Sequence, residues 1–259
     1  MSENVSRREI SICIPTYEFK GEGVKYLSEL LDTLQLQNFD DFNVVVSDHS
    51  VDDKIYDLCK EKSKLFEIIY VRNEHGRGNL GPNTNVALEN GTGRILKVVY
   101  QDDLFVNRDA LQVIKDAYDT GCKWAFNSFC HTRDGVLTFR DVVPRWGDKM
   151  LEGRNLLGNP SGLSVLNRCK MYMREDLNLL VDTDFYHRMR MKHGLPYIIE
   201  DVLTATREHE NRTSASRIVY DHQINHPEGG WVVNKAELDL LHFTYKEFFE
   251  GGEKYPDEA

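Results

Sequence analysis

Residues 95–103 read ILKVVYQDD and place two adjacent carboxylates, Asp102 and Asp103, directly after a mostly apolar run. Such a run is typical of a buried strand over residues 95–100. In open α/β folds, ligands bind at the carboxyl edge of the sheet. A divalent cation such as Mg²⁺ or Mn²⁺ would relieve the repulsion between the two carboxylates there. The alternative is that Asp102 caps a helix that begins near residue 107.

The residues before this doublet alternate between short β-branched runs and longer amphipathic stretches, which predicts a parallel sheet covered by helices. Right-handed crossovers would place the carboxyl ends of these strands along one edge. The expected strands are 10–14, 42–46, 66–71 and 95–100, and the expected helices are 24–36, 52–64 and 82–88.

The second half is less regular. Strands are expected at 123–129, 163–166 and 197–204, a hairpin at 132–140, and helices at 108–118, 184–192 and 235–249. Neither an internal repeat nor a low-complexity linker interrupts the chain. We therefore expect one α/β domain, residues 1–216, with a C-terminal helical extension, residues 217–259, packed on the same domain.

Composition excludes several classes of protein. The chain has 259 residues, 41% of them hydrophobic, and a formal net charge of −10, which disfavours nucleic acid as a partner. We expect no transmembrane segment, because no apolar run reaches the length of a membrane span, and the first nine residues lack the apolar region of a signal peptide. Five widely spaced cysteines without a Cys-x-x-Cys pair fit a reducing cytoplasm better than a disulfide or zinc framework.

Residues 76–81 read GRGNLG and satisfy the dinucleotide-binding pattern G-x-G-x-x-G, with Asp102 about 20 residues downstream. However, four polar residues, 72–75, separate the preceding strand from Gly76, whereas the pattern needs its tight turn directly at the strand end. We interpret the loop as a flexible polar connection, and an NAD-dependent oxidoreductase that uses it remains the rival hypothesis.

Four motifs occur in a fixed order. They are ICIPTY at residues 12–17, VVVSDHSVD at 44–52, NLGPNTN at 79–85 and LKVVYQDD at 96–103. The series resembles the family 2 glycosyltransferases of the GT-A fold over about residues 10–216. This resemblance implies a Rossmann-like, mostly parallel sheet flanked by helices. It also implies a nucleotide-sugar transferase that inverts the anomeric carbon and uses Mn²⁺ or Mg²⁺, held by Asp102 and Asp103.

The resemblance also assigns the nucleotide side. The residues that would contact the nucleotide are Pro15, Thr16, Tyr17, Asp48, Asn79, Asn85 and Asp102, with Asp48 as the reader of the base. Ser47 and His49 stand where the family usually has an acid and a glycine, and Thr84 stands where an Arg is common. Arg77 and Lys97 are the candidates to replace that Arg at the phosphates.

On the acceptor side, Asn159, Pro160 and Ser161 resemble the family's acceptor loop, although these residue types also build ordinary turns. Asp182 falls where the family has its general base, and Asp184 retains a second acidic position. An inverting displacement needs one carboxylate to take the proton of the acceptor hydroxyl. The alternative is that both aspartates only favour the start of a helix.

Residues 207–216, REHENRTSAS, resemble the closing motif of the family. His209 would contact the metal ion or the diphosphate, and Arg212 would pair with phosphate. The alternative for a lone His in a polar loop is that water solvates it.

These features together predict transfer of a sugar from a nucleoside diphosphate sugar, first of all a UDP-sugar, to a hydroxyl of an acceptor, expected to be a glycan. A non-catalytic sugar-binding module is a third hypothesis. The combination of Asp102, Asp103 and Asp182 speaks against it, because a binding module has no need of a base.

Overall fold

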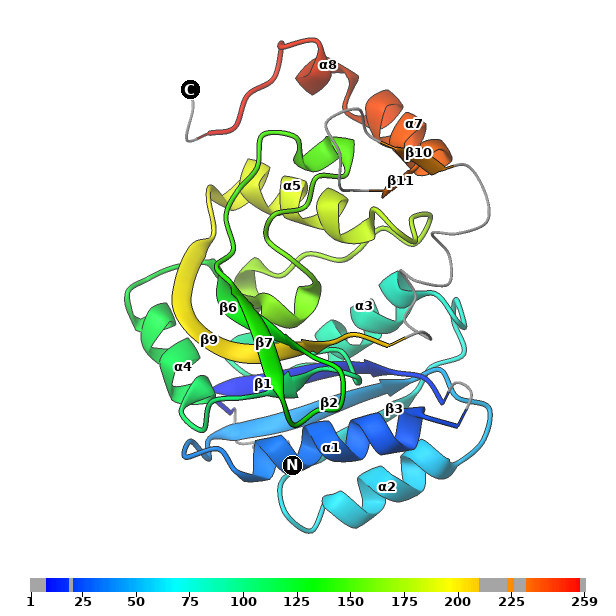
Figure 1. The fold of residues 1–259 in the computed structure, drawn as a ribbon, viewed down its shortest axis with the longest axis vertical. Helices are drawn as coiled ribbons and strands as arrows, with labels where there is room; N and C mark the ends of the chain where they lie inside the picture. Colours follow the sequence, from blue (N-terminus) through cyan, green and yellow to red (C-terminus); the bar gives the residue numbers. More distant parts are fainter. Residues whose placement is uncertain (1–7, 19–20, 210–222, 226–231, 257–259) are drawn as a thin grey trace, which may run out of the picture.

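A mixed β-sheet with helices on both faces organises the chain (Figure 1). The computed structural model describes residues 8–18, 21–209, 223–225 and 232–256. The strands are β1 (Ile10–Thr16), β2 (Phe42–Asp48), β3 (Ile68–Arg72), β4 (Ile95–Val98), β5 (Leu104–Phe105), β6 (Trp124–Thr132), β7 (Thr138–Val142), β8 (Leu163–Leu166), β9 (Tyr197–Arg207), β10 (Gln223–Asn225) and β11 (Val232–Asn234).

The α-helices are α1 (Gly23–Gln35), α2 (Lys54–Lys62), α3 (Leu80–Asn90), α4 (Ala110–Asp119), α5 (Val181–His193), α7 (Lys235–Thr244) and α8 (Lys246–Phe249). Short 3₁₀ turns follow the same numbering as η1 (Met150–Glu152), η2 (Pro160–Gly162) and η3 (Asn167–Cys169). Among the helices of the described residues, none combines the length and the apolar character of a membrane span.

The main sheet has the strand order β3-β2-β1-β4-β8-β6-β9-β5, with β7 paired to β6. β1 to β4 are parallel, as the alternating pattern predicts. In the second half, β8 runs antiparallel to both β4 and β6, while β6 and β9 are parallel. The N-terminal end of β8 therefore lies at the same edge as the carboxyl ends of β1, β4 and β9, which brings the loop 159–161 to that edge.

Successive side chains along a strand point to opposite faces of the sheet, and they form two separate hydrophobic cores. Ile10, Ile12 and Ile14 of β1 pack against α1, α2 and α4, whereas Cys13 points to the opposite face with α3, α5 and α7. Helix α1 buries the four leucines whose spacing predicts it, Leu27, Leu30, Leu31 and Leu34. In Figure 1, α1 and α2 lie below the sheet, and α5, α7 and α8 lie above it.

The element boundaries differ from the sequence expectation in two places that bear on the site. β4 ends at Val98 rather than at residue 100, because the backbone N–H of Tyr100 bonds to the Ser161 hydroxyl instead of a neighbouring strand. The helix expected over 235–249 is interrupted at Tyr245, the residue that lies between the end of α7 and the start of α8. The expected boundary between residues 216 and 217 lies outside the described residues.

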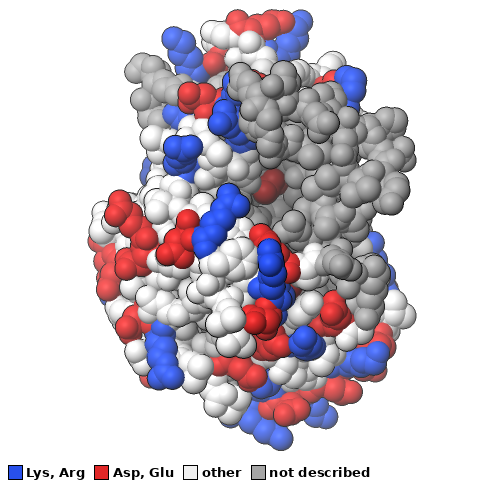
Figure 2. All heavy atoms as spheres, in the orientation of Figure 1, with Lys and Arg blue, Asp and Glu red and all other residues white. Residues whose placement is uncertain are grey.

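One face of the molecule carries charges of both signs. On the face drawn in Figure 2, basic and acidic side chains alternate over the lower part of the molecule, where α1 and α2 lie.

Candidate active site

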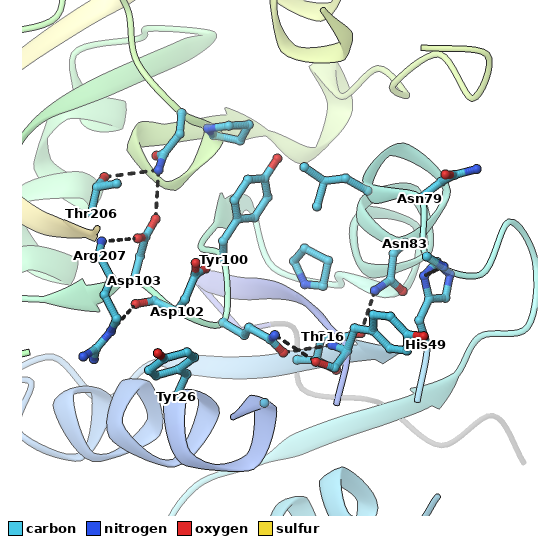
Figure 3. A pocket seen from close by; sticks show the side chains of 18 of the residues that line it. Thr16, Tyr26, His49, Asn79, Asn83, Tyr100, Asp102, Asp103, Thr206 and Arg207 are labelled. Atoms are coloured by element: carbon cyan, nitrogen blue, oxygen red, sulfur yellow. Dashed lines mark hydrogen bonds between the residues drawn. The ribbon is translucent and has the colours of Figure 1, made fainter. Parts of the chain in front are cut away.

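A cavity of about 550 Å³ opens at the carboxyl edge of β1 and β4. Figure 3 shows Asp102 and Asp103 at one end, and Thr16 and His49 at the other. The residues that line it are Pro15, Thr16, Tyr17, Glu22, Gly23, Tyr26, His49, Gly78, Asn79, Leu80, Asn83, Tyr100, Gln101, Asp102, Asp103, Asn159, Pro160, Asn178, Leu179, Val181, Asp182, Thr206, Arg207 and His209. Most residues assigned from the sequence therefore meet in one cavity.

The two carboxylates of the doublet have different surroundings. Asp103 is buried, and its oxygens accept hydrogen bonds from the backbone N–H of Arg207 at 2.9 Å and from Asn159 Nδ2 at 3.0 Å. Burial, with the neighbouring charge of Asp102, raises the pKa of Asp103 to about 7. Asp102 Oδ2 instead lies 2.9 Å from Nε2 of His209. Asp103 is thus held from both sides, whereas Asp102 and His209 form a pair that faces the cavity.

This pair suits a divalent cation. Two neighbouring ligands of an octahedral ion at about 2.1 Å lie about 3 Å apart, close to the separation of Asp102 Oδ2 and His209 Nε2. Within the described part of the chain, no cluster of three or more His, Cys, Asp or Glu side chains could hold a metal. An ion held by this pair would have to take its remaining ligands from a phosphate group and water, which is how Mg²⁺ is commonly bound in proteins.

Arg207 is the residue of this region to which the sequence assigns no role. Its Nε donates to the backbone oxygen of Asp102 at 2.9 Å, its guanidinium pairs with Glu29, and its Cζ lies 4.7 Å from the centre of the Tyr26 ring. Gly135, at a φ of +81°, lies against this guanidinium, and a Cβ there would come within 2.7 Å of it. Arg207 therefore ties the doublet to α1 and β9. The only signal for it in the sequence is its position two residues before His209.

At the opposite end of the cavity, side chains hold the loop after β1 in place. Gln101 binds the backbone of Tyr17 twice, accepting from its N–H at 2.8 Å and donating to its oxygen at 3.0 Å. Asn83 Nδ2 donates to the backbone oxygen of Thr16 at 2.9 Å, and its Oδ1 accepts from the hydroxyl of Ser47 at 2.6 Å. Ser47, which departs from the family pattern, thus supports a residue that lines the cavity.

His49, the other departure in that motif, links this end to the loop 73–79. Its Nδ1 accepts from the backbone N–H of Gly78 at 3.2 Å, and its Nε2 lies 3.0 Å from the backbone oxygen of His75. Burial is the main cause of its lowered pKa. The polar spacer between β3 and α3 is therefore a structured connection that brings Gly78 and Asn79 to the cavity.

Two predicted nucleotide contacts do not line the cavity. Asp48 is fully buried behind it, where it accepts from the backbone N–H of Ser50 and the hydroxyl of Tyr70, each at 2.7 Å. Asn85 forms two hydrogen bonds with the backbone of Met173, at 2.9 and 2.7 Å. Both side chains stabilise neighbouring segments. Arg212 lies outside the described residues.

Only part of the predicted acceptor loop lines the cavity. Asn159 and Pro160 line the cavity, whereas Ser161 is buried and binds the chain beneath it. Its hydroxyl accepts from the backbone N–H of Tyr100 at 2.9 Å, and its backbone oxygen accepts from Lys97 Nζ at 2.5 Å. Lys97 is fully buried, which lowers its pKa well below the ordinary value, and it cannot reach a phosphate in the cavity. Arg77 does not line the cavity either.

Of the two acids at the start of α5, only Asp182 lines the cavity. Asn155 Nδ2 donates to its Oδ2 at 2.9 Å, and burial raises its pKa to about 6. Asp184 is fully buried on another side of the helix, where it accepts from the Tyr245 hydroxyl at 2.6 Å and from Arg188 Nε at 2.8 Å. A half-buried carboxylate that remains ionised near neutral pH is suited to accept a proton.

The sequence profile described as Glycosyl transferase family 2 matches residues 11–180. The chain belongs to this family. A search of curated protein sequences finds no significant match.

Solved structures of glycosyltransferases share the fold. S. aureus TarS, residues 1–349, aligns with a TM-score of 0.61 at 18% identity, over 93% of this chain and 73% of that one. The same protein in complex with UDP-GlcNAc aligns with a TM-score of 0.61 at 16% identity, over 93% and 74%. The mannosyltransferase PcManGT from Pyrobaculum calidifontis, in complex with GDP-Man and Mn²⁺, gives 0.61 at 18%, over 98% and 67%. This chain is accordingly a glycosyltransferase with a GT-A, Rossmann-like α/β fold.

Proposed function

We propose that this glycosyltransferase moves one sugar from a nucleoside diphosphate sugar to a hydroxyl of a glycan acceptor, with inversion at the anomeric carbon. The observation that carries this proposal is that two groups of side chains reach one cavity from different elements. Asp102, Asp103 and His209 lie at the sheet edge, while Asp182, alone of its pair, reaches the cavity from α5. A site for the leaving diphosphate and a proton acceptor are thus contributed by separate walls.

Asp182 is the general base. The acceptor oxygen attacks the anomeric carbon as the bond from that carbon to the diphosphate oxygen breaks, and the diphosphate leaves with the electron pair. The hydroxyl proton passes to Asp182. Asn155 Nδ2 donates to Oδ2 of this carboxylate at 2.9 Å and the backbone N–H of Thr183 donates to Oδ1 at 2.8 Å, so both oxygens are held in place at the wall of the cavity.

Asp102 and His209 would hold a Mn²⁺ or Mg²⁺ ion. Such an ion, when bound, neutralises the negative charge that grows on the diphosphate. Asp103 fixes Asn159 and the backbone of Arg207 around this position. The Arg207 guanidinium, which is paired with Glu29, holds the backbone of Asp102 at the same end of the cavity.

The nucleoside would lie between the loop 15–17 and His49, Gly78 and Asn79, at the end away from the carboxylates. A UDP-sugar is the first candidate donor and a GDP-sugar the second, because structural neighbours were solved with UDP-GlcNAc and with GDP-Man. Since Asp48 is turned away and fully hydrogen-bonded, we assign contact with the base to this loop and His49 instead.

Calorimetry with UDP and GDP in the presence of Mn²⁺, followed by a screen of donor hydrolysis, tests the proposal. We expect one diphosphate to bind and its sugar conjugates to be hydrolysed slowly without acceptor. Binding of NADH in place of both diphosphates would overturn the proposal in favour of an oxidoreductase. Diphosphate binding without donor hydrolysis, or transfer to any acceptor, would favour a non-catalytic module.

A further inference from the structure

The C-terminal segment contacts helix α5, or the chain just before it, at three successive positions. Glu237 of α7 binds the chain just before the helix, Tyr245 binds Asp184 in its first turn, and the Tyr255 hydroxyl lies 2.9 Å from Nδ1 of His187. We refer to Glu237, Tyr245 and Tyr255 as the C-terminal clamp. All three contacts join residues that are 57 to 68 positions apart in the sequence.

Glu237 forms the largest number of hydrogen bonds among these contacts. Its two oxygens accept hydrogen bonds from the backbone N–H groups of Asn178, Leu179 and Leu180, at 2.8 to 3.3 Å. The residue is only 8% exposed. Helix α5 has no side-chain cap at Leu180, so Glu237 supplies from another helix the acceptors and the negative charge that a helix N-terminus favours.

The residues held in this way belong to the active site. Asn178 and Leu179 line the cavity, and Asp182 follows Leu180 by two positions. Tyr245 then fixes Asp184, two residues beyond Asp182, through a hydrogen bond of 2.6 Å. The base therefore lies between two points of attachment to the C-terminal clamp.

From this arrangement we propose that Glu237 is a positioning residue for catalysis, which holds the 178–180 backbone so that Asp182 faces the acceptor hydroxyl. This inference rests on the proposed role of Asp182. Tyr245 supports the same placement from the other side. The C-terminal segment thereby becomes part of the catalytic machinery, although none of its described residues lines the cavity.

The charge of Glu237 also affects the pKa of Asp182, which can be measured separately from stability. It adds to the burial that raises the pKa of Asp182, whereas the Thr183 backbone and Asn155 lower it. The other titratable groups facing Asp182 are Tyr100 and Tyr186, whose own pKa values are raised by burial and by Asp182, so both stay neutral. Removing the charge of Glu237 should therefore lower the pKa of Asp182.

The test compares Glu237→Gln with Asp239→Asn in the full chain. Asp239 is on the same helix and pairs with Lys235 at the surface, 2.9 Å away, so it controls for the loss of a carboxylate from α7. We expect Glu237→Gln to lower kcat roughly tenfold to a hundredfold with little change in the donor KM. The acid limb of its pH profile should move to lower pH. Asp239→Asn should match the wild type in both respects.

Hydrogen exchange of residues 178–180 supplies a measurement that needs no substrate. Glu237→Gln should speed it at least about tenfold, because the amide of Gln offers one acceptor oxygen where the carboxylate offers two. If that variant does not fold, Tyr245→Phe, which removes one hydroxyl, should still lower kcat severalfold. A folded Glu237→Gln variant with the wild-type kcat and an unmoved acid limb would overturn the inference. So would a Tyr245→Phe variant whose melting temperature falls while its kcat stays at the wild-type value. A wild-type enzyme that transfers no sugar from any donor would instead refute the proposed function.

Discussion

The half of the molecule that would bind the nucleotide and the half that would bind the acceptor reach the cavity by different means. In the first half, the strands β1 to β4 pair in parallel. This pairing places the loops that follow them at one edge of the sheet. In the second, hydrogen bonds made by individual side chains set the positions, such as those from Asn155 to Asp182 and from Asn159 to Asp103. Substitutions in the second half should therefore affect catalysis more, and those in the first half stability more.

The largest effect is expected at the base. Asp182→Asn should lower kcat by about 10²- to 10⁴-fold, because the acceptor hydroxyl loses its proton acceptor, while donor affinity stays unchanged. Steady-state kinetics and calorimetry measure the two quantities. Asp184→Asn is the matched control and should lower the melting temperature without a comparable loss of transfer. If Asp184→Asn abolishes transfer and Asp182→Asn does not, the base lies two residues further on than we propose.

Removal of the metal tests the proposed metal-binding role of Asp102 and His209 at the sheet edge. Chelation with EDTA should weaken binding of the nucleoside diphosphate by roughly a hundredfold, because Asp102 then faces the diphosphate without a compensating cation. His209→Ala should reproduce part of that loss in the presence of saturating Mn²⁺. Calorimetry that finds equal affinity with and without EDTA would remove the metal from the mechanism.

The pH dependence should report the half-buried environment of Asp182. Its pKa is raised to about 6, and the base must be ionised to act, so kcat should fall about tenfold for each pH unit below that value. Above pH 7 this group should no longer limit the rate. An acid limb near pH 4, the ordinary value for a carboxyl group, would show that the active base is an exposed carboxylate elsewhere.

The smallest effect on activity is expected at Asp48, in the half that depends on the strand ladder. Asp48→Asn should lower the free energy of unfolding by about 1 to 3 kcal/mol, because it disturbs the buried bonds to Ser50 and Tyr70. Donor KM should stay within about twofold of the wild type. Denaturant unfolding and donor titration measure the two effects. A large rise in KM with unchanged stability would restore Asp48 as the reader of the base.

Sequence reasoning located the strands of the first half well because their signal is local. Apolar runs of strand length separated by helices of period 3.6 allow few other arrangements, and a strand and its following loop are placed together. Pro15, Thr16, Tyr17, Asn79, Asp102 and Asp103 accordingly line the cavity. The same reasoning could not tell which way Asp48 or Asn85 turns, since each depends on partners in other elements.

By itself, the sequence determined the α/β fold class and the edge at which the site lies, because both follow from periodicity and chain order, and its resemblance to the family indicated the carboxylates that compete for the chemistry. Tertiary structure alone decided that Asp182 rather than Asp184 faces the cavity, that Lys97 is buried beneath Ser161, and that Arg207 and Glu237 support the site. These outcomes depend on hydrogen bonds between residues far apart in the chain, 104 positions for Arg207 and Asp103. No local pattern encodes such a pairing, because its free energy arises only when folding removes both partners from water.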